Sequence, residues 1–287
     1  MRFAAIDAEK AHYPLSLMCR VLEVTRSGYY AWRRRPPSKH AELDAELRVV
    51  VAAAHDESGG IYGAPRVLES LQKSGHPTSR KRVARLMREQ GLAGRKKRRF
   101  CVTTDSDHSL DTAPNVLQRR FDPDAPNTAW AADITYLPTH EGWLYLAIVL
   151  DLWSRRIVGW SMSESIDTEL ALSALRMAID TRRPMPGLVH HSDRGTQYAA
   201  TDYRHALDEN GLICSMSRRA NCWDNAVAES FFGTLKVELV GDRTFRSRME
   251  ARQAVFKYIE AFYNSRRLHS SLGYRSPAEF EKLYWAA

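Results

Sequence analysis

The sequence predicts an α/β fold, with a mixed five-stranded sheet and flanking helices, preceded by an all-α region. From about residue 127 onward, three segments rich in Trp, Tyr, Ile, Val and Leu follow one another with only short breaks. Strand-like and helix-like segments then alternate to about residue 240. Hairpin strands followed by alternating units imply a mixed sheet with helices on both faces.

The individual elements are placed by hydrophobic period and by Gly, Pro and Ser breaks. Short breaks between the first three strands predict antiparallel pairing. The predicted strands are 128–138, 143–152, 155–162, 188–192 and 212–216. The predicted helices are 167–181, 199–210 and a long helix that begins near Asp224.

The first hundred residues predict two helix-turn-helix units. In the first unit, over residues 12–35, Thr25 is the expected N-cap of the second helix. The second unit contains a helix at 41–55, one opened by Pro65 and one capped by Ser79. We therefore expect a first helix-turn-helix unit at 1–38, a second at 39–99, an exposed linker at 100–120, and an α/β core with a C-terminal helical tail at 121–287.

Basic charge is concentrated in this helical region. Residues 1–120 hold 23 Lys+Arg and 13 Asp+Glu, whereas residues 121–287 hold 19 and 21. Such a segment favours DNA, because binding releases condensed counterions. A recognition helix offers its first turn to base edges, which predicts DNA contacts from Arg80, Lys81 and Arg82. An ordinary helical domain with a basic surface is the alternative.

The chain shows no signal for a membrane or for secretion. No apolar run reaches the roughly 18 residues that span a bilayer, and the N-terminus lacks a secretory core. We expect a cytoplasmic, nucleoid-associated protein with no membrane partner. The cysteines form no CxxC pair, so free thiols are expected rather than disulfides or a zinc site. They are Cys19, Cys101, Cys214 and Cys222.

Three acids occupy positions that predict an active site. Asp133 lies inside the first strand, where an acid is costly unless it is paired or binds a cation. Asp193 follows the fourth strand, and the C-terminal edges of strands are where such sheets place their sites. Glu229 lies on the long helix. Alone, each acid has the ordinary interpretation of a surface charge or ion-pair partner.

The face of the last helix supports this interpretation. At 100° per residue, Asn225, Gly233 and Lys236 fall within about 40° of Glu229. That face is polar, with a glycine that permits close approach and a lysine placed for a phosphodiester. The packing stripe lies on another face, and its members are Ala228, Phe231, Leu235 and Leu239.

Three carboxylates suit two Mg²⁺ ions about 3.5–4 Å apart, which activate an attacking oxygen and stabilise the leaving one. The adjacent His190 and His191 invite a zinc interpretation. In a strand, however, they point to opposite faces and cannot easily share an ion. We expect His191 to line the site near Asp193 and His190 to be packed.

The loop before the last helix, residues 217–223, is expected to order on DNA. Arg218 and Arg219 are predicted to bind phosphate, and Trp223 to stack on an unpaired base. In the alternative interpretation, Trp223 packs against the core and the arginines are solvated.

Asp133, Asp193 and Glu229, with 35 residues between the last two, resemble the DDE triad of integrase-core transposases and retroviral integrases. The wider context resembles the second-reading-frame product (OrfB) of bacterial insertion sequences of the insertion-sequence-three family. The matching segments cover essentially the whole chain. They are GIYGAPR (60–66), SRKRVARLM (79–87), WAADITY (130–136), HSDRGTQY (191–198), CWDNAVAESFF (222–232) and YNSRRLHSSLGY (263–274).

This resemblance implies an RNase H-like core and DNA cutting and joining at terminal inverted repeats. It implies that the triad binds two Mg²⁺ ions, for which Mn²⁺ substitutes, and that Lys236 contacts DNA. The zinc-binding N-domain of retroviral integrases is replaced here by helix-turn-helix units. We expect a homo-oligomer on DNA, and fusion to or association with the upstream-frame product, because the family's complete transposase is often a frameshift fusion.

Two other function classes remain. A transcription regulator would explain the basic N-terminal part but not three converging acids. A nuclease of the RNase H type would use the same metal site, although the joined DNA-binding region favours transposition. An oligonucleotide assay with Mg²⁺ separates the three: regulators give shifts, nucleases give nicks, and strand-transferases give joined products.

Overall fold

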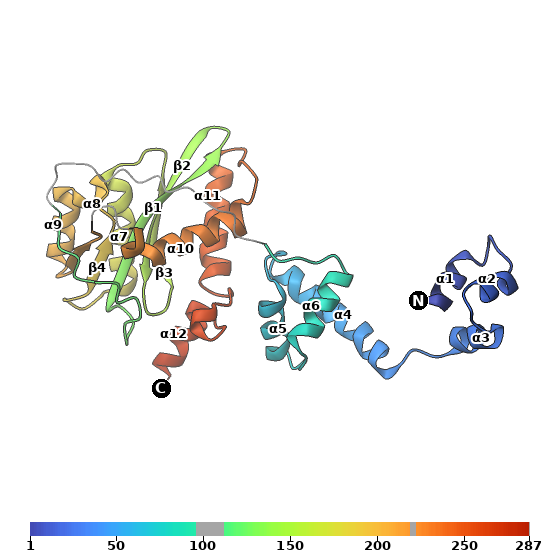
Figure 1. Cartoon of the computed structure of the whole chain (residues 1–287). Helices are drawn as coiled ribbons and strands as arrows, with labels where there is room; N and C mark the ends of the chain where they lie inside the picture. The colour runs from blue at the N-terminus through green and yellow to red at the C-terminus, as the bar shows by residue number, and fades with distance from the viewer. Residues whose placement is uncertain (96–111, 219–221, 287) are drawn as a thin grey trace.

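The computed structural model describes residues 1–95, 112–218 and 222–286 (Figure 1). The N-terminal part is all-helical, as predicted. Its helices are α1 (Arg2–Glu9), α2 (Leu15–Val21), α3 (Arg26–Arg34), α4 (Lys39–Glu57), α5 (Ala64–Lys73) and α6 (Arg80–Glu89). Within the described ranges, no helix is both long and apolar enough to cross a bilayer.

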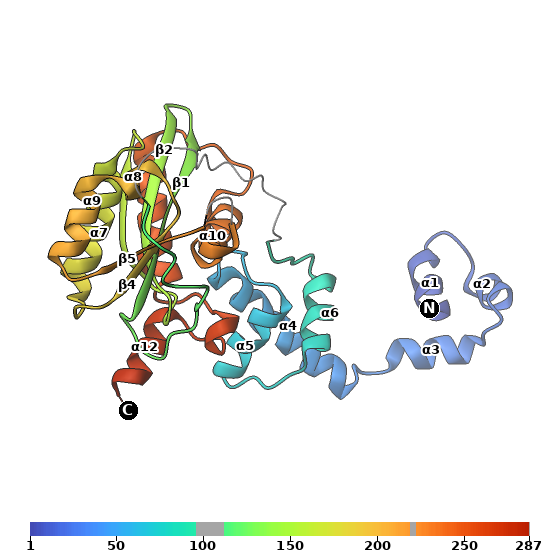
Figure 2. The same ribbon diagram turned by 60° about the vertical axis from the view of Figure 1, so that its left-hand side comes forward.

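Helices α1–α3 form a small body with its own core, set apart from the rest of the chain in both views (Figures 1 and 2). Ile6, Met18, Cys19 and Tyr29 are its buried residues. The Thr25 side chain accepts the backbone N–H of Gly28, which confirms the predicted N-cap of α3. Helix α1 was not predicted, because Ile6 is its one buried residue and a single apolar position defines no helical period.

Helices α4–α6 pack as a three-helix unit. Its core is filled by side chains from all three helices, and Ser79 caps α6 by accepting the backbone N–H of Arg82, as predicted. The core members from these helices include Leu47, Val51, Val67, Leu71, Val83, Leu86 and Met87. On its surface, Asp44 of α4 accepts hydrogen bonds from Arg82 and Arg85 of α6.

The sheet is mixed and five-stranded, as predicted, with the order β3-β2-β1-β4-β5. Strands β1, β2 and β3 pair antiparallel, whereas β4 runs parallel to β1 and β5 parallel to β4. The strands are β1 (Ala129–Thr139), β2 (Gly142–Asp151), β3 (Ile157–Ser163), β4 (Val189–Ser192) and β5 (Ile213–Met216). The parallel half brings the C-terminal ends of β1 and β4 towards one edge.

Helices cover both faces of this sheet (Figure 2). Two hydrophobic cores lie on the two faces; one contains side chains of α7 and α9, the other side chains of α10 and α11. These helices are α7 (Thr168–Arg182), α8 (Thr196–Ala199), α9 (Thr201–Glu209), α10 (Ala226–Leu235) and α11 (Arg248–Phe256). The predicted packing stripe of α10 is confirmed, since Ala228, Phe231 and Leu235 are buried.

The segment predicted as a C-terminal helical tail is part of the core. After α10 the chain forms π-helical turns at Lys236–Val240 and Lys257–Tyr263, and it ends in α12 (Pro277–Trp285). Val255, Ile259 and Tyr263 are buried against the sheet. The same segment holds the three-helix unit, because Leu268 lies in the core of α4–α6. This C-terminal segment is helical, as predicted, but it packs into the core and does not form a separate tail.

The exposed linker predicted at 100–120 is also wrong in its described part. Leu117 is buried in the core under the sheet. The backbone N–H groups of Val116 and Leu117 both donate to the Ser215 hydroxyl on β5, at 3.0 and 3.1 Å. Residues 115–119 therefore form a strap packed against the core, in which a buried hydroxyl accepts the backbone N–H groups. Residues 100–111 of the predicted linker lie outside the described ranges.

The close packing of β3 against α7 at Gly159 can be tested by adding a side chain there. A Cβ at this position would meet Ala174 O, Ala178 N and Ala178 Cβ at less than van der Waals distance. Gly159→Ala should therefore destabilise the fold by about 1–3 kcal/mol, as overpacking does. Urea unfolding of the full chain measures this cost. Gly233→Ala is the matched control, because a Cβ there meets nothing within 4 Å; equal stability of the two variants would contradict the close β3–α7 contact.

Candidate active site

Strand register places Asp133 beside Asp193. On the parallel strands β1 and β4, Ala131 is the register partner of His191. Asp133 lies two residues further along β1, and Asp193 two residues further along the neighbouring segment, one residue past the end of β4. Neighbouring strands of a sheet are about 4.8 Å apart. Ala131 is buried in the α10 face of the sheet, and side chains two residues apart share a face. Asp133 therefore also faces α10.

Helix α10 brings Glu229 to the same place. Its buried stripe faces the sheet and leaves Glu229 exposed. Burial, then the charge of Asp193, then that of Glu229, raise the pKa of Asp133. Burial and the charge of Asp193 likewise raise the pKa of Glu229. The charge of Asp193 therefore acts on both Asp133 and Glu229, which is consistent with the three carboxylates lying near one another.

The carboxylates do not form a closed ligand shell. Among the residues that the structure describes, no group of three or more His, Cys, Asp or Glu side chains is arranged to hold a metal ion as it stands. One oxygen of each aspartate is used locally: Asp133 Oδ1 accepts Ile134 N at 2.8 Å, and Asp193 Oδ1 accepts Gly195 N at 2.9 Å. These bonds fix the carboxylates on the backbone.

Asp224, which the sequence analysis did not select, anchors the start of α10. Its buried carboxylate accepts hydrogen bonds from Arg218 Nε and Nη2, the Arg218 backbone N–H, Arg119 Nε and Asn115 Nδ2, at 2.8–3.0 Å. The Arg218 hydrogen bonds are the largest cause lowering the pKa of Asp224. The signal in the sequence was an acid at a helix start, six residues after an arginine, but its burial is not visible there.

The same contact changes the interpretation of the loop before α10. Arg218 is held by Asp224, although 58% of its side chain remains exposed. Trp223 is 69% exposed, which contradicts the alternative in which it packs against the core. Arg219 lies outside the described residues.

Lys236 and Asn225 differ in position. The Lys236 ammonium lies 5.0 Å from the centroid of the Tyr136 ring, and its charge lowers the pKa of Asp133, so it is beside the carboxylates. Asn225 is only 4% exposed and donates through Nδ2 to the Ala132 carbonyl at 3.2 Å. The predicted DNA contact by Asn225 does not fit this burial. Its amide instead ties the start of α10 to β1, next to Asp133.

Comparison with known proteins identifies the family. Residues 123–222 and 210–277 match two family models described as integrase core domain, and residues 42–100 match an HTH-like domain. The chain is 44% identical over 283 residues to the transposase InsF of insertion sequence IS3A from Escherichia coli strain K12, with 98% of each chain covered. The chain belongs to the IS3 family of transposases.

Other relatives agree with this assignment. The chain is 46% identical over 267 residues to an uncharacterized 31 kDa protein of insertion element IS600 from Shigella sonnei, covering 93% of this chain and 98% of the relative. The reaction of this family is DNA transposition, so the chain is an enzyme of the polynucleotidyl transferase type that acts on DNA.

Similarity to solved structures is weaker. A simian T-cell lymphotropic virus intasome in complex with PP2A regulatory subunit B56 gamma aligns with 80% of this transposase and 73% of that chain, at 15% identity and a TM-score of 0.46. The HTLV-2 integrase catalytic core domain in complex with magnesium (dimeric form) aligns with 55% and 97%, at 16% identity and a TM-score of 0.43.

The two histidines are structural in this transposase. His191 lies between Ser215 Oγ at 2.8 Å and Ser217 Oγ at 3.3 Å, and His190 contacts Tyr203 Oη at 3.2 Å. Burial lowers the pKa of His190 to about 3 and that of His191 to about 4, so both are neutral. His190 is packed as predicted, but His191 is fully buried and does not line the site.

The predicted DNA-contacting residues of α6 differ in their exposure. Arg80 and Lys81 are exposed in the first turn of α6. Arg82 instead donates to Asp44 at 2.6 Å, with 28% of its side chain exposed, so it joins α4 to α6 and does not fit a base contact. Cys19 and Cys214 are free thiols, as predicted.

Asp224→Asn should destabilise the fold, because it leaves Arg218 and Arg119 facing a neutral amide. Both arginines are about half exposed and can be solvated, so we expect a cost of about 2–3 kcal/mol, less than the roughly 3–5 kcal/mol for breaking a fully buried ion pair. A lowered pKa stabilises the protein at pH values above the ordinary 3.8 of an aspartate. That stabilisation is lost as the pH falls through the folded-state pKa.

Urea unfolding at several pH values measures this effect. The difference between wild type and Asp224→Asn should be constant from about pH 5 to 8 and should shrink below about pH 4. Asp122→Asn is the control, because Asp122 also accepts from an arginine but is 92% exposed. A variant as stable as wild type at neutral pH would show that Asp224 does not anchor α10.

Proposed function

We propose that this transposase catalyses metal-dependent DNA cleavage and strand transfer at the terminal inverted repeats of its insertion sequence, through Asp133, Asp193 and Glu229. The observation that carries the proposal is the register of β1 and β4, which sets two aspartates side by side beneath a helix bearing a glutamate. A scaffold for DNA binding alone has no need of three carboxylates placed so close that like charges raise the pKa values of Asp133 and Glu229.

The donor set fits a pair of divalent cations. Carboxylate oxygens are hard ligands, which suit Mg²⁺ and also Mn²⁺. The raised pKa values of Asp133 and Glu229 arise partly from like charges, and a cation in their midst would remove that repulsion. When bound, two such ions supply the charge that favours an attacking oxygen and a leaving oxygen. The protein's part is to hold the three carboxylates on rigid elements.

Other groups would hold the DNA strand at the site. Lys236 is beside Asp133 and would pair with a phosphate, and Gly233 leaves open space on α10 for a backbone. The exposed Trp223 would stack on an unpaired base, while Arg218 and Arg219 would bind phosphate. Arg80 and Lys81, exposed on α6, would contact the duplex.

We also propose the context in which this chemistry takes place. A reaction that joins two element ends to one target brings several DNA strands together, so the enzyme would act as a homo-oligomer on DNA. Fusion to, or association with, the upstream-frame product would complete the transposase. Because its substrate is DNA, the enzyme would act on the nucleoid, in the cytoplasm.

Removing one carboxylate should abolish chemistry and spare DNA binding. Asp133→Asn, Asp193→Asn and Glu229→Gln should each lower strand transfer at least 10²–10³-fold, because each removes charge needed in the transition state. Transfer is measured with labelled terminal-repeat oligonucleotides and Mg²⁺, and binding by gel shift. Asp180→Asn, an exposed carboxylate on α7, should leave both unchanged.

Three results would contradict this proposal. Near-normal transfer by a variant would remove that residue from the site. Nicked products alone in wild type would indicate a nuclease, and shifted complexes alone would indicate a regulator. Chelation of the divalent ions should stop transfer, and Mn²⁺ should restore it.

Lys236→Ala should weaken joining far more than it weakens binding by the helical units, because its cation acts at the scissile phosphate. Lys236→Arg should recover part of the loss, since the charge is kept while the geometry changes. Transfer and binding are measured side by side. Lys257→Ala, which removes an exposed lysine elsewhere, serves as the control; wild-type joining by Lys236→Ala would show that this lysine does not meet DNA.

A further inference from the structure

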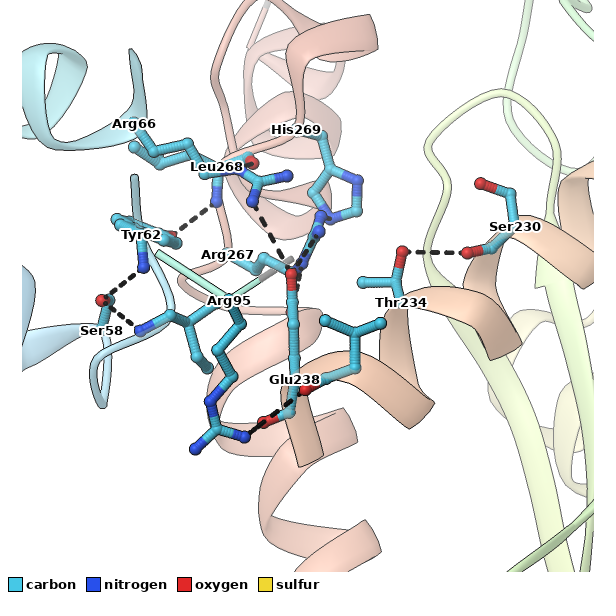
Figure 3. A network of polar contacts seen from close by, with 12 residues as sticks. Ser58, Tyr62, Arg66, Arg95, Ser230, Thr234, Glu238, Arg267, Leu268 and His269 are labelled. Carbon is cyan, nitrogen blue, oxygen red and sulfur yellow. Dashed lines mark hydrogen bonds and ion pairs between the residues drawn. The ribbon is translucent and has the colours of Figure 1, made fainter. Parts of the chain in front are cut away.

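A cavity of about 470 Å³ lies where the three-helix unit meets the catalytic core. Its walls come from α5, from the loop after α6, from β2 and the turn that follows it, from α10 and the π-helical turn after it, and from the C-terminal segment; Figure 3 shows most of these walls. Four arginines line it, but only one carboxylate does. The arginines are Arg66, Arg95, Arg155 and Arg267, and the carboxylate is Glu238.

The carboxylate is already neutralised by one arginine. Arg267 donates to Glu238 through Nε at 2.8 Å and Nη2 at 2.7 Å, and both side chains are buried. Tyr258 also donates to Glu238, at 2.8 Å. Arg66 lies 3.7 Å from the same carboxylate and uses Nε to reach the Leu268 carbonyl. Arg155 pairs with Asp122 at 2.7 Å, but that carboxylate is 92% exposed and is not among the residues that line the cavity. Positive charge therefore exceeds negative charge in the cavity wall.

The positive charge of the cavity wall also affects the pKa of a buried histidine, His269. Burial first, and then the charges of Arg267, Arg66 and Arg155, lower the pKa of His269 to about 2. His269 is therefore neutral and adds no charge of its own. The cavity would gain most from an anion with several acceptor oxygens, since arginines from different directions can each donate to a separate oxygen.

The cavity lies beside the catalytic helix. Ser230 and Thr234 of α10 line it, and Ser230 directly follows Glu229 (Figure 3). Consecutive Cα atoms are about 3.8 Å apart, so the cavity and the carboxylate site lie on adjacent sides of one helix. In a DNA strand, charges recur about every 3.4 Å along the axis. A strand held at Glu229 would thus carry neighbouring phosphates within reach of the cavity.

We propose that this cavity binds a backbone phosphate of the DNA strand, with Arg66, Arg95 and Arg155 as its cations and the Ser230 hydroxyl as a further donor. The proposal rests on the proposed function, because it extends the path of the strand held at Glu229. Since Arg66 and Arg95 belong to the helical unit and Arg155 to the core, the bound phosphate would also join the two units.

The salt dependence of DNA binding tests the site. Each lost phosphate contact should reduce the slope of log affinity against log salt by about 0.9. Arg66→Gln and Arg155→Gln in the full chain should each show this loss and bind about tenfold more weakly near physiological salt. Arg176→Gln, an arginine 58% exposed on α7, is the matched control and should keep the wild-type slope.

A neutral phosphate analogue locates the contact on the DNA. Methylphosphonates are placed singly near the element end of the terminal-repeat duplex. At one position, the substitution should weaken wild type but not Arg66→Gln, because that variant has already lost the contact. Inorganic phosphate forms a separate arm: at constant ionic strength it should raise the Tm of wild type more than that of Arg66→Gln.

The outcomes separate this inference from the proposed function. If Arg66→Gln and Arg155→Gln both keep the wild-type salt slope, the proposed DNA contact in the cavity is wrong. If they keep that slope while inorganic phosphate still raises the Tm of wild type more than that of Arg66→Gln, the cavity binds free phosphate and not DNA. The binding assay contains no divalent cation, so it does not depend on catalysis. A chain with the expected slopes that never joins strands would overturn the proposed function alone, whereas a wild type without DNA binding would overturn both.

Discussion

The buried carboxylate of Asp224 is the contact on which the active-site arrangement depends. Taking this charge out of water is costly. The cost is offset by hydrogen bonds from the side chains of Asn115 and Arg119 and from the side chain and backbone N–H of Arg218. The contact fixes where α10 begins. The position of Glu229 above the sheet then follows from the packing stripe of that helix, while Asp133 and Asp193 follow from strand register alone.

A second set of polar contacts fixes the helical unit to the core. Tyr62 accepts the backbone N–H of Leu268 at 2.9 Å, and Lys73 pairs with Glu279 of α12 at 2.9 Å. With the Arg66 contact to Leu268, these bonds run from α4–α6 to the C-terminal segment and not to the sheet. The C-terminal segment therefore has two faces, one that closes the core beneath the sheet and one that receives the DNA-binding unit.

Local pattern was enough to predict the strands and most of the helices and to single out the three acids as candidates, but not to predict the surroundings of several polar side chains. The first three strands were predictable because their aromatic and branched residues match a half-buried sheet, and Asp133 was conspicuous because it interrupts one of them. Arg82, Asn225 and His191 were misjudged because their partners, Asp44, the Ala132 carbonyl and Ser215, lie 24–93 residues away in the chain. Burial of a polar group depends on such distant partners, which periodicity does not reveal.

The contact between Tyr62 and Leu268 spans 206 residues of sequence, which has a consequence for synthesis. Translation at about 5–20 residues per second takes roughly 10–40 s to add that length. During this interval α4–α6 can fold around their own side chains, but the segment that receives them does not yet exist. The nascent chain thus passes through a stage in which the helical unit is undocked and the integrase core is incomplete. The two can pack together only after the C-terminal segment has been synthesised.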